Sequence, residues 1–222
     1  MTVANIQSGI WANVRDWVFD LDNTLYPAPQ LYDLIGEKMT AYVMRVVDVD
    51  AAEAERLRDH YHLEYGATVV GLRERHGVDA VDFMREVHDV PTNVVHPDPE
   101  LDTLIAALPG RKIVFTNGGG GHAERVVAQI GIAHHFEHLF DLESAGFVPK
   151  PHRGAYERLV SECGVDPTRA VLFEDTLRNL EPAHDMGFAT VLVGAVHPEP
   201  RPPYVDFWSA ELKPFLRDLL VA

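Results

Sequence analysis

Short apolar runs that end abruptly in polar residues recur along this chain, and they constrain its fold more than any other feature. Four such runs occupy residues 17–19, 112–115, 170–173 and 190–193, and a shorter run occupies 138–140. Runs that are apolar throughout, rather than alternating, are typical of strands buried on both faces of a sheet. Helical patterns separate the runs. The alternation therefore predicts an α/β fold with a parallel sheet and helices on both of its faces.

The expected helices carry recognisable ends. Gly131, Gly164 and Gly187 each follow a helical pattern, at the position where a left-handed residue commonly ends a helix. Pro182 lies inside the last of these patterns, and with Asn179 as the N-cap it would fall in the first turn, where proline is tolerated. The segment 205–207 and a final helix near 211–220 are expected to complete the fold.

Residues 30–90 interrupt the alternation with helical patterns alone. Seven apolar residues between Leu31 and Val46 fall on one helical stripe, and three further helical patterns follow, the last two at 69–75 and 81–87. Prolines stand at both junctions, which suits a small lobe that pivots on the sheet. We therefore predict a small α-helical cap at 29–95, inserted after the first strand into a core made of 1–28 and 96–222.

The net charge of the chain limits the kinds of molecule that it is suited to bind. The chain has 222 residues, and its 34 acidic against 19 basic residues give a net charge of −15. So acidic a chain is unsuited to bind a nucleic acid polymer or an anionic membrane, and it has no apolar run near the roughly 20 residues of a membrane span. One cysteine, Cys163, excludes an intramolecular disulfide. We expect a cytoplasmic monomer or dimer that acts on a small molecule.

Polar side chains follow the predicted strands directly, and the carboxyl ends of parallel strands are where ligands bind in such sheets. These residues are Asp20 and Asp22, Thr116 and Asn117, and Glu174 and Asp175, with Lys150 in a proline-flanked loop before a helix. Four carboxylates gathered at one edge repel each other by several kcal/mol unless a cation or protons intervene. Carboxylate oxygens are hard ligands that suit Mg²⁺. The pattern predicts a magnesium site at this edge.

The sequence Asp20-Leu21-Asp22-Asn23-Thr24, with Thr116, Lys150 and Glu174-Asp175 after it in that order, resembles the haloacid dehalogenase (HAD) superfamily of aspartyl-phosphate phosphatases. The resemblance extends from about residue 17 to 194. It implies a Rossmann-like core with a helical cap after the first motif, and a phosphomonoester hydrolase as the function. Dehalogenases of the superfamily lack an acid at the second position, so Asp22 favours phosphoester hydrolysis.

The resemblance also implies a role for each motif residue. Asp20 would be the nucleophile that forms a phospho-aspartate. Asp22 would be the general acid and base, with a pKa raised by neighbouring anions. Lys150 would neutralise charge and, with Thr116 and Asn117, bind the phosphate. The metal ligands would be Asp20, Asp175, Asp22 through its carbonyl, and Glu174, which bonds metal-bound water or Lys150.

Substrate choice is expected to lie in the cap. Residues 17–27, 61–72 and 173–180 resemble the pyrimidine 5′-nucleotidase branch, which implies a pyrimidine nucleoside 5′-monophosphate as substrate. Tyr61 and Tyr65 lie one helical turn apart and either stack on a base or, as helix-face aromatics more often do, pack the core of the cap. A phosphatase or mutase for a sugar phosphate, or a phosphatase for phosphoglycolate, is the alternative within the superfamily.

Two other features of the sequence are typical of different functions. The run Gly118–Gly121, with Asp141 downstream, formally matches a dinucleotide-binding fingerprint, so a nucleotide-dependent oxidoreductase is the alternative of another class. It leaves the acidic motifs unexplained. His134, His135 and His138 form a histidine cluster that we interpret as surface residues rather than a zinc site, because partners at zinc spacing are missing.

Overall fold

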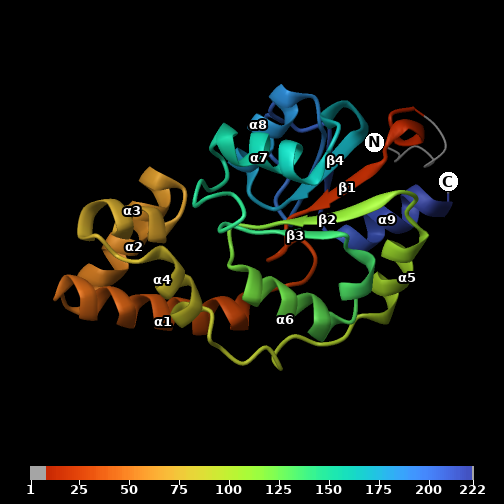
Figure 1. The fold of residues 1–222 in the computed structure, drawn as a ribbon. Coiled ribbons are helices and arrows are strands. Elements are labelled where there is room, and N and C mark those ends of the chain that lie inside the picture. The colour runs from red at the N-terminus through yellow and green to blue at the C-terminus, as the bar shows by residue number, and fades with distance from the viewer. Residues whose placement is uncertain (1–8, 222) are drawn as a thin grey trace.

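A computed structural model describes residues 9–221, and it contains the predicted parallel sheet (Figure 1). The strands are β1 (Asp16–Phe19), β2 (Arg111–Phe115), β3 (His138–Phe140), β4 (Ala170–Glu174), β5 (Ala189–Val193) and β6 (Phe207–Ser209). Their order is β3-β2-β1-β4-β5-β6, and every neighbouring pair is parallel. The α/β fold predicted from the apolar runs is thus confirmed.

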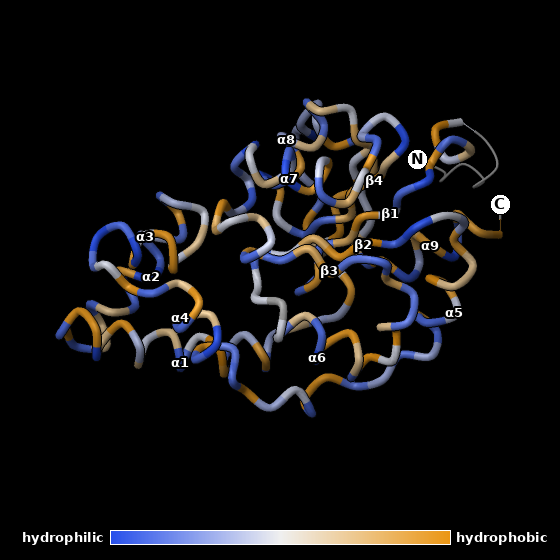
Figure 2. The backbone as a smooth tube through the Cα atoms, viewed as in Figure 1, coloured by the Kyte–Doolittle hydropathy of each residue, from blue (hydrophilic) through white to orange (hydrophobic). Residues whose placement is uncertain are grey.

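Helices cover both faces of this sheet. They are α5 (Pro99–Ala107), α6 (Gly120–Ile130), α7 (Arg153–Cys163), α8 (Leu177–Met186) and α9 (Leu212–Val221), with short 3₁₀ turns η1 (Trp11–Asn13), η2 (Ala133–His135) and η3 (Pro167–Arg169). Successive strand residues face opposite sides. Phe19 therefore joins the core under α5, α6 and α9, whereas Val18 joins the core under α7 and α8. The middle of the sheet is mostly orange in the hydropathy colouring of Figure 2, as burial on both faces requires.

Helix ends match the predicted glycines but not the predicted cap of α8. Gly131, Gly164 and Gly187 have positive φ and follow α6, α7 and α8. The N-cap of α8 is Thr176, so the proposed Asn179 cap is wrong and Pro182 lies in the helix interior. The helix begins earlier because the strand before it ends in acidic residues whose oxygens accept hydrogen bonds from the turn. The expected closing segment 205–207 overlaps β6 at Phe207, where that strand begins.

The inserted segment is helical throughout. It forms α1 (Pro29–Val47), α2 (Ala51–Tyr65), α3 (Thr68–His76) and α4 (Ala80–Val87). These helices share a separate apolar cluster that includes Val43, Leu72 and Phe83, and this cluster reaches Leu142 in the loop after β3. Figure 1 shows them beside the carboxyl ends of the strands. The division into residues 29–95 and the remainder stays a prediction. Within residues 9–221, no helix combines the length and apolar content needed to cross a membrane.

Candidate active site

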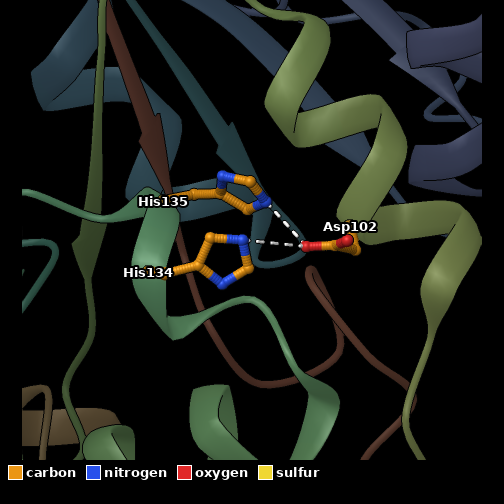
Figure 3. Close-up of side chains that lie close together, drawn as sticks. All are labelled: Asp102, His134 and His135. Atoms are coloured by element: carbon orange, nitrogen blue, oxygen red, sulfur yellow. Dashed lines mark hydrogen bonds and ion pairs between the residues drawn. The ribbon is translucent and has the colours of Figure 1, made fainter.

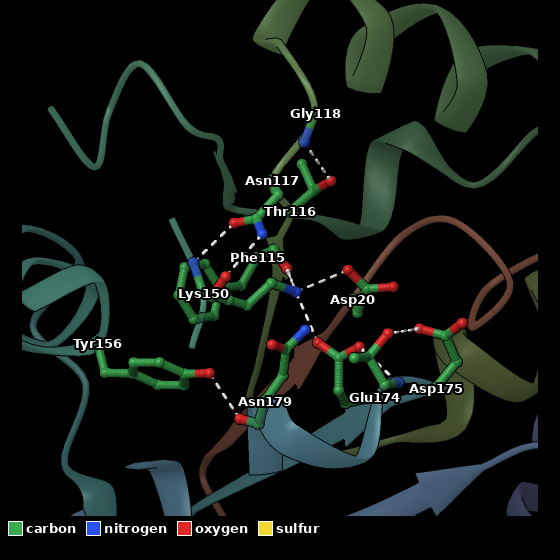
Figure 4. A network of polar contacts seen from close by, with 11 residues as sticks. Asp20, Phe115, Thr116, Asn117, Gly118, Lys150, Tyr156, Glu174, Asp175 and Asn179 are labelled. Atoms are coloured by element: carbon green, nitrogen blue, oxygen red, sulfur yellow. Dashed lines mark hydrogen bonds and ion pairs between the residues drawn. The ribbon is translucent and has the colours of Figure 1, made fainter. Parts of the chain in front are cut away.

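Lys150 occupies the centre of a buried polar network at the carboxyl edge of the sheet (Figure 4). Its Nζ atom donates hydrogen bonds to Asp20 Oδ1 at 2.7 Å, to Glu174 Oε2 at 2.7 Å and to the Phe115 carbonyl at 2.8 Å. The side chain is 1% exposed. Because β1 lies between β2 and β4, the loops after these three strands meet here, and one lysine bridges all of them.

Asn117 fixes the loop that carries this lysine. Its Nδ2 donates to the Lys150 carbonyl at 3.0 Å, and its Oδ1 accepts from the Lys150 N–H at 2.8 Å. The side chain predicted to bind phosphate is therefore engaged with the main chain, and any phosphate contact of Asn117 falls to its backbone N–H. Thr116 is buried, and its Oγ1 accepts from the Gly118 N–H at 2.9 Å, which shapes the adjoining turn.

Three of the four predicted carboxylates form a cluster, and that of Asp22 is not part of it. Asp20, Glu174 and Asp175 each offer a carboxylate oxygen, and these three atoms lie within 4.8 Å of one another. Thr176 orients two of the carboxylates, since its N–H donates to Glu174 Oε1 and its hydroxyl to Asp175 Oδ1. Three hard oxygen donors at this spacing match what a magnesium ion binds.

Burial and mutual repulsion disfavour the ionised forms of these three carboxylates unless positive charge lies close to them. Burial, and then the charge of Glu174, raise the pKa of Asp20 to about 7, although Lys150 opposes the shift. Burial likewise raises the pKa of Glu174 and Asp175. Burial alone would lower the pKa of Lys150, but the neighbouring carboxylates outweigh it and leave that pKa raised. The lysine therefore stays charged, and a divalent cation would favour the ionised acids.

Asp22 behaves in the opposite way to the prediction. Neighbouring anions were expected to raise its pKa, but the pKa of Asp22 is lowered. Burial acts to raise it, and hydrogen bonds from His122 and Tyr26 outweigh burial. Both residues were missed in the sequence. Nothing in the sequence marks Tyr26, which lies four positions after Asp22, as a partner of that carboxylate. The position of His122 could have indicated a role in the site, because it lies in the first turn of α6, directly after the loop that carries Thr116.

A cavity of about 270 Å³ opens above the network, between the sheet edge and the cap. Its lining from the cap and adjoining segment includes Tyr32, Ile35, Met39, Arg58, His62, Thr68, Phe83 and His88. Tyr61 and Tyr65 are not in this lining. The Tyr61 hydroxyl instead pairs with His76 Nε2 at 2.8 Å, and the Tyr65 hydroxyl accepts from Arg75 at 2.8 Å. Their observed role is packing and hydrogen bonding within the cap.

The histidine cluster gains a partner that spacing did not reveal. Figure 3 shows His134 and His135 pointing at Asp102 of α5, with Nε2 atoms 3.3 and 2.7 Å from one carboxylate oxygen. His134 is exposed and His135 is partly buried, while His138 lies on β3. The Asp102 carboxylate is hydrogen-bonded to His135 and lies within ion-pair distance of His134, so it links α5 to the turn before β3.

Cys163 is buried at the end of α7, and burial raises the pKa of its thiol to about 11.

The glycine run does not form an open nucleotide cradle. A Cβ placed on Gly119 would lie 3.6 Å from Met84 and 3.7 Å from His88, so the end of α4 already covers this loop. Asp141 accepts from the N–H and hydroxyl of Ser144 at 2.8 and 2.7 Å, which commits it to a turn.

The fold and this edge together define a capped α/β protein, with an acidic pocket and a buried lysine beside the inserted helices. The profile of the haloacid dehalogenase-like hydrolases matches residues 17–187, and the chain therefore belongs to that family. Membership in a hydrolase family replaces the oxidoreductase alternative, because the matched region contains the run Gly118–Gly121 on which that alternative rested.

Several known proteins are similar to the chain. It is 29% identical over 191 residues to Phosphate metabolism protein 8 of Saccharomyces cerevisiae, covering 78% of this chain and 60% of that relative. It shares its fold with CbbY from Rhodobacter sphaeroides, solved in complex with phosphate, at a TM-score of 0.64 and 16% identity over 93% and 99% of the chains. The HAD-hydrolase YfnB from Bacillus subtilis, solved with magnesium, matches at 0.60 and 15% over 93% and 98%.

Proposed function

We propose that this protein is a Mg²⁺-dependent phosphomonoesterase that works through a phospho-aspartate on Asp20. The observation that carries the proposal is the convergence of Lys150 with Asp20, Glu174 and Asp175 at one sheet edge. The names of the yeast relative and the phosphate complex of CbbY agree with phosphate chemistry. The favoured substrate is a pyrimidine nucleoside 5′-monophosphate, which rests on the resemblance to the nucleotidase branch.

The residues present fit a magnesium ion. Asp20, Glu174 and Asp175 supply hard oxygen atoms within 4.8 Å of one another. Burial raises the pKa of all three acids, and a bound cation would oppose this shift, which supports the proposal. Asp20 and Asp175 would hold the ion with the Asp22 carbonyl, and Glu174 would act through water or Lys150. When bound, Mg²⁺ supplies positive charge to the phosphate and to the attacking carboxylate.

The chain's own groups then perform the reaction in two halves. In the first, an Asp20 oxygen forms a bond to phosphorus while the ester P–O bond breaks, and Asp22 protonates the leaving oxygen. In the second, water attacks phosphorus, Asp22 accepts its proton, and Asp20 is released. Lys150 stabilises the charge that gathers on Asp20, and Thr116 with the Asn117 N–H binds phosphate oxygens. The dianionic phosphate itself favours protonation of Asp22 before the first half, since a like charge disfavours the ionised form.

One observation favours a second class of substrate. Arg58 and Arg178 line the cavity, and their hydrogen-bond acceptors within residues 9–221 are the Gly36 carbonyl, the Thr40 hydroxyl and His62. None of these acceptors is a carboxylate, so both guanidinium groups can meet a second anionic group. Phosphoglycolate, which carries a carboxylate beside its phosphate, is therefore the second candidate.

The test is a hydrolysis screen of the purified protein against pyrimidine nucleotides, sugar phosphates and phosphoglycolate, with Mg²⁺ and with EDTA. We expect turnover with Mg²⁺ only, and none after Asp20→Asn. Asp218→Asn, at an exposed position of α9, is the matched control and should retain full activity. An active Asp20→Asn protein would refute the phospho-aspartate route. Absence of hydrolysis of every phosphoester by the wild type would refute the function itself.

A further inference from the structure

We infer that His122 and Tyr26 are positioning residues that hold one oxygen of Asp22, Oδ1, so that the other, Oδ2, faces the substrate as the proton-transferring atom. The inference rests on the proposed function and deepens it. It concerns two side chains that belong to none of the acidic motifs, and it assigns different tasks to the two oxygens of one carboxylate.

Two buried donors converge on Oδ1. The Tyr26 hydroxyl donates to it, and His122 Nε2 lies 3.2 Å from it. Tyr26 is 6% exposed and His122 is 1% exposed, so neither contact competes with bulk water. A carboxylate fastened by one hydrogen bond still rotates about its Cβ–Cγ bond, whereas two donors from different directions restrict that rotation. Asp22 is held by its own loop on one side and by α6 on the other.

The second oxygen faces the phosphate-binding turn. A Cβ placed on Gly118 would lie 3.9 Å from Asp22 Oδ2, 3.3 Å from Thr116 Oγ1 and 3.4 Å from the His122 ring. Oδ2 therefore borders the same small space as the hydroxyl proposed to bind phosphate. Asp22 and Thr116 both line the cavity. Because Tyr26 and His122 already occupy Oδ1, Oδ2 is the oxygen left to meet a leaving oxygen on a bound phosphate.

His122 is held in place by packing on its remaining side. Its Nδ1 atom is buried and has no hydrogen-bond partner within residues 9–221, whereas its Nε2 atom faces Asp22 Oδ1. The ring of His88 lies against it at a centroid distance of 4.8 Å. Arg125 of α6 donates to the His88 carbonyl at 2.7 Å and so secures the segment that covers His122. The closed cap thereby buttresses the imidazole that holds the acid.

The chemical consequence is specific to proton transfer. As the Asp20 oxygen bonds to phosphorus and the ester bond breaks, the bond's electron pair goes to the leaving oxygen, which takes the proton from Asp22 Oδ2. In the second half, water gives its proton back to Oδ2 as the acyl phosphate opens. A freely rotating Asp22 would misdirect both transfers without weakening phosphate binding. Loss of the holding residues should therefore lower kcat and leave KM nearly unchanged.

The experiment compares His122→Ala, His122→Asn and Tyr26→Phe on two substrates under single-turnover conditions. A preferred alkyl phosphomonoester needs a proton on its leaving oxygen, whereas p-nitrophenyl phosphate releases a stable phenolate. We expect the first-half rate on the alkyl ester to fall about 10- to 100-fold in His122→Ala and Tyr26→Phe, with a change below about threefold for p-nitrophenyl phosphate. His122→Asn restores a donor and should recover part of the loss.

His197→Ala, at a histidine paired with Glu199 away from the cavity, is the matched control and should change neither rate. Equal losses on both substrates, or unchanged rates in the folded variants, would overturn the inference while the proposed function stands. A wild type that hydrolyses neither substrate would overturn the proposed function. Should His122→Ala fail to fold, Tyr26→Phe and His122→Asn decide the question by the same comparison of substrates.

Discussion

Replacing Asp20 with asparagine should stabilise the metal-free protein, and the gain should grow with pH. Asp20 is 7% exposed and has a pKa raised from 3.8 to about 7. A raised folded-state pKa contributes stability that is complete below the unfolded-state value and is lost as pH rises through the folded-state value. Between those values each pH unit costs about 1.4 kcal/mol of stability. Relative to acidic pH, the wild type therefore loses about 2 kcal/mol by pH 5, where Asp20 is protonated only in the folded state, and about 4 kcal/mol by pH 8, where Asp20 is ionised in both states.

Asparagine removes this cost and keeps an oxygen that can accept from Lys150, which retains Glu174 as its charged partner. Urea unfolding in EDTA, followed by the fluorescence of the buried Trp17, measures the difference between variant and wild type across this pH range. We expect Asp20→Asn to gain free energy of unfolding over the wild type, more at pH 8 than at pH 5. The electrostatic reasoning would be refuted by a variant that is less stable than the wild type at pH 8. It would also be refuted if the difference in free energy of unfolding between variant and wild type did not change with pH.

Three further outcomes follow from the same site. Lys150→Met leaves two buried carboxylates unpaired and should cost about 3–5 kcal/mol by urea unfolding, whereas Met at the exposed Lys38 should cost little. Mg²⁺ at a hundred times its Kd should stabilise the wild type by about 2.7 kcal/mol, and Asp175→Asn should abolish this shift in a thermal melt. Gly66→Val should lower turnover more than Gly77→Val. Both glycines have positive φ, but only at Gly66 would a Cβ contact Pro149, at 2.9 Å, in the loop that carries Lys150. Equal turnover in the two variants would contradict this expectation.

Local patterns predicted most of the fold. The apolar runs located the central strands, because strands buried on both faces of a sheet consist mostly of apolar residues. Glycines after three helical patterns marked helix ends, since a left-handed residue is required there. The cap of α8 was misplaced, because its start depends on oxygens of the preceding acidic pair rather than on Asn179.

Most motif residues of the candidate site were also predictable, because Asp20, Thr116 and Asp175 directly follow parallel strands whose ends share one edge of the sheet. Lys150 lies in a loop before α7, and its place in the order of motifs marked it; in the structure it joins Asp20 and Glu174. The direction of the Asp22 pKa shift was not predictable. It depends on which of the chain's 12 histidines lies against the carboxylate, and that histidine is 100 residues away.

The sequence by itself determined the order of strands and helices and the residue types that end each strand, since both follow from periodicity and local backbone preference. Only the tertiary structure decided which groups share a proton or a charge at the site. Hydrogen bonding and repulsion act over a few ångströms in space, and distance along the chain does not report that separation. The pairing of Asp22 with His122, the low exposure of Lys150 and the cover over Gly119 are all properties of the folded chain alone.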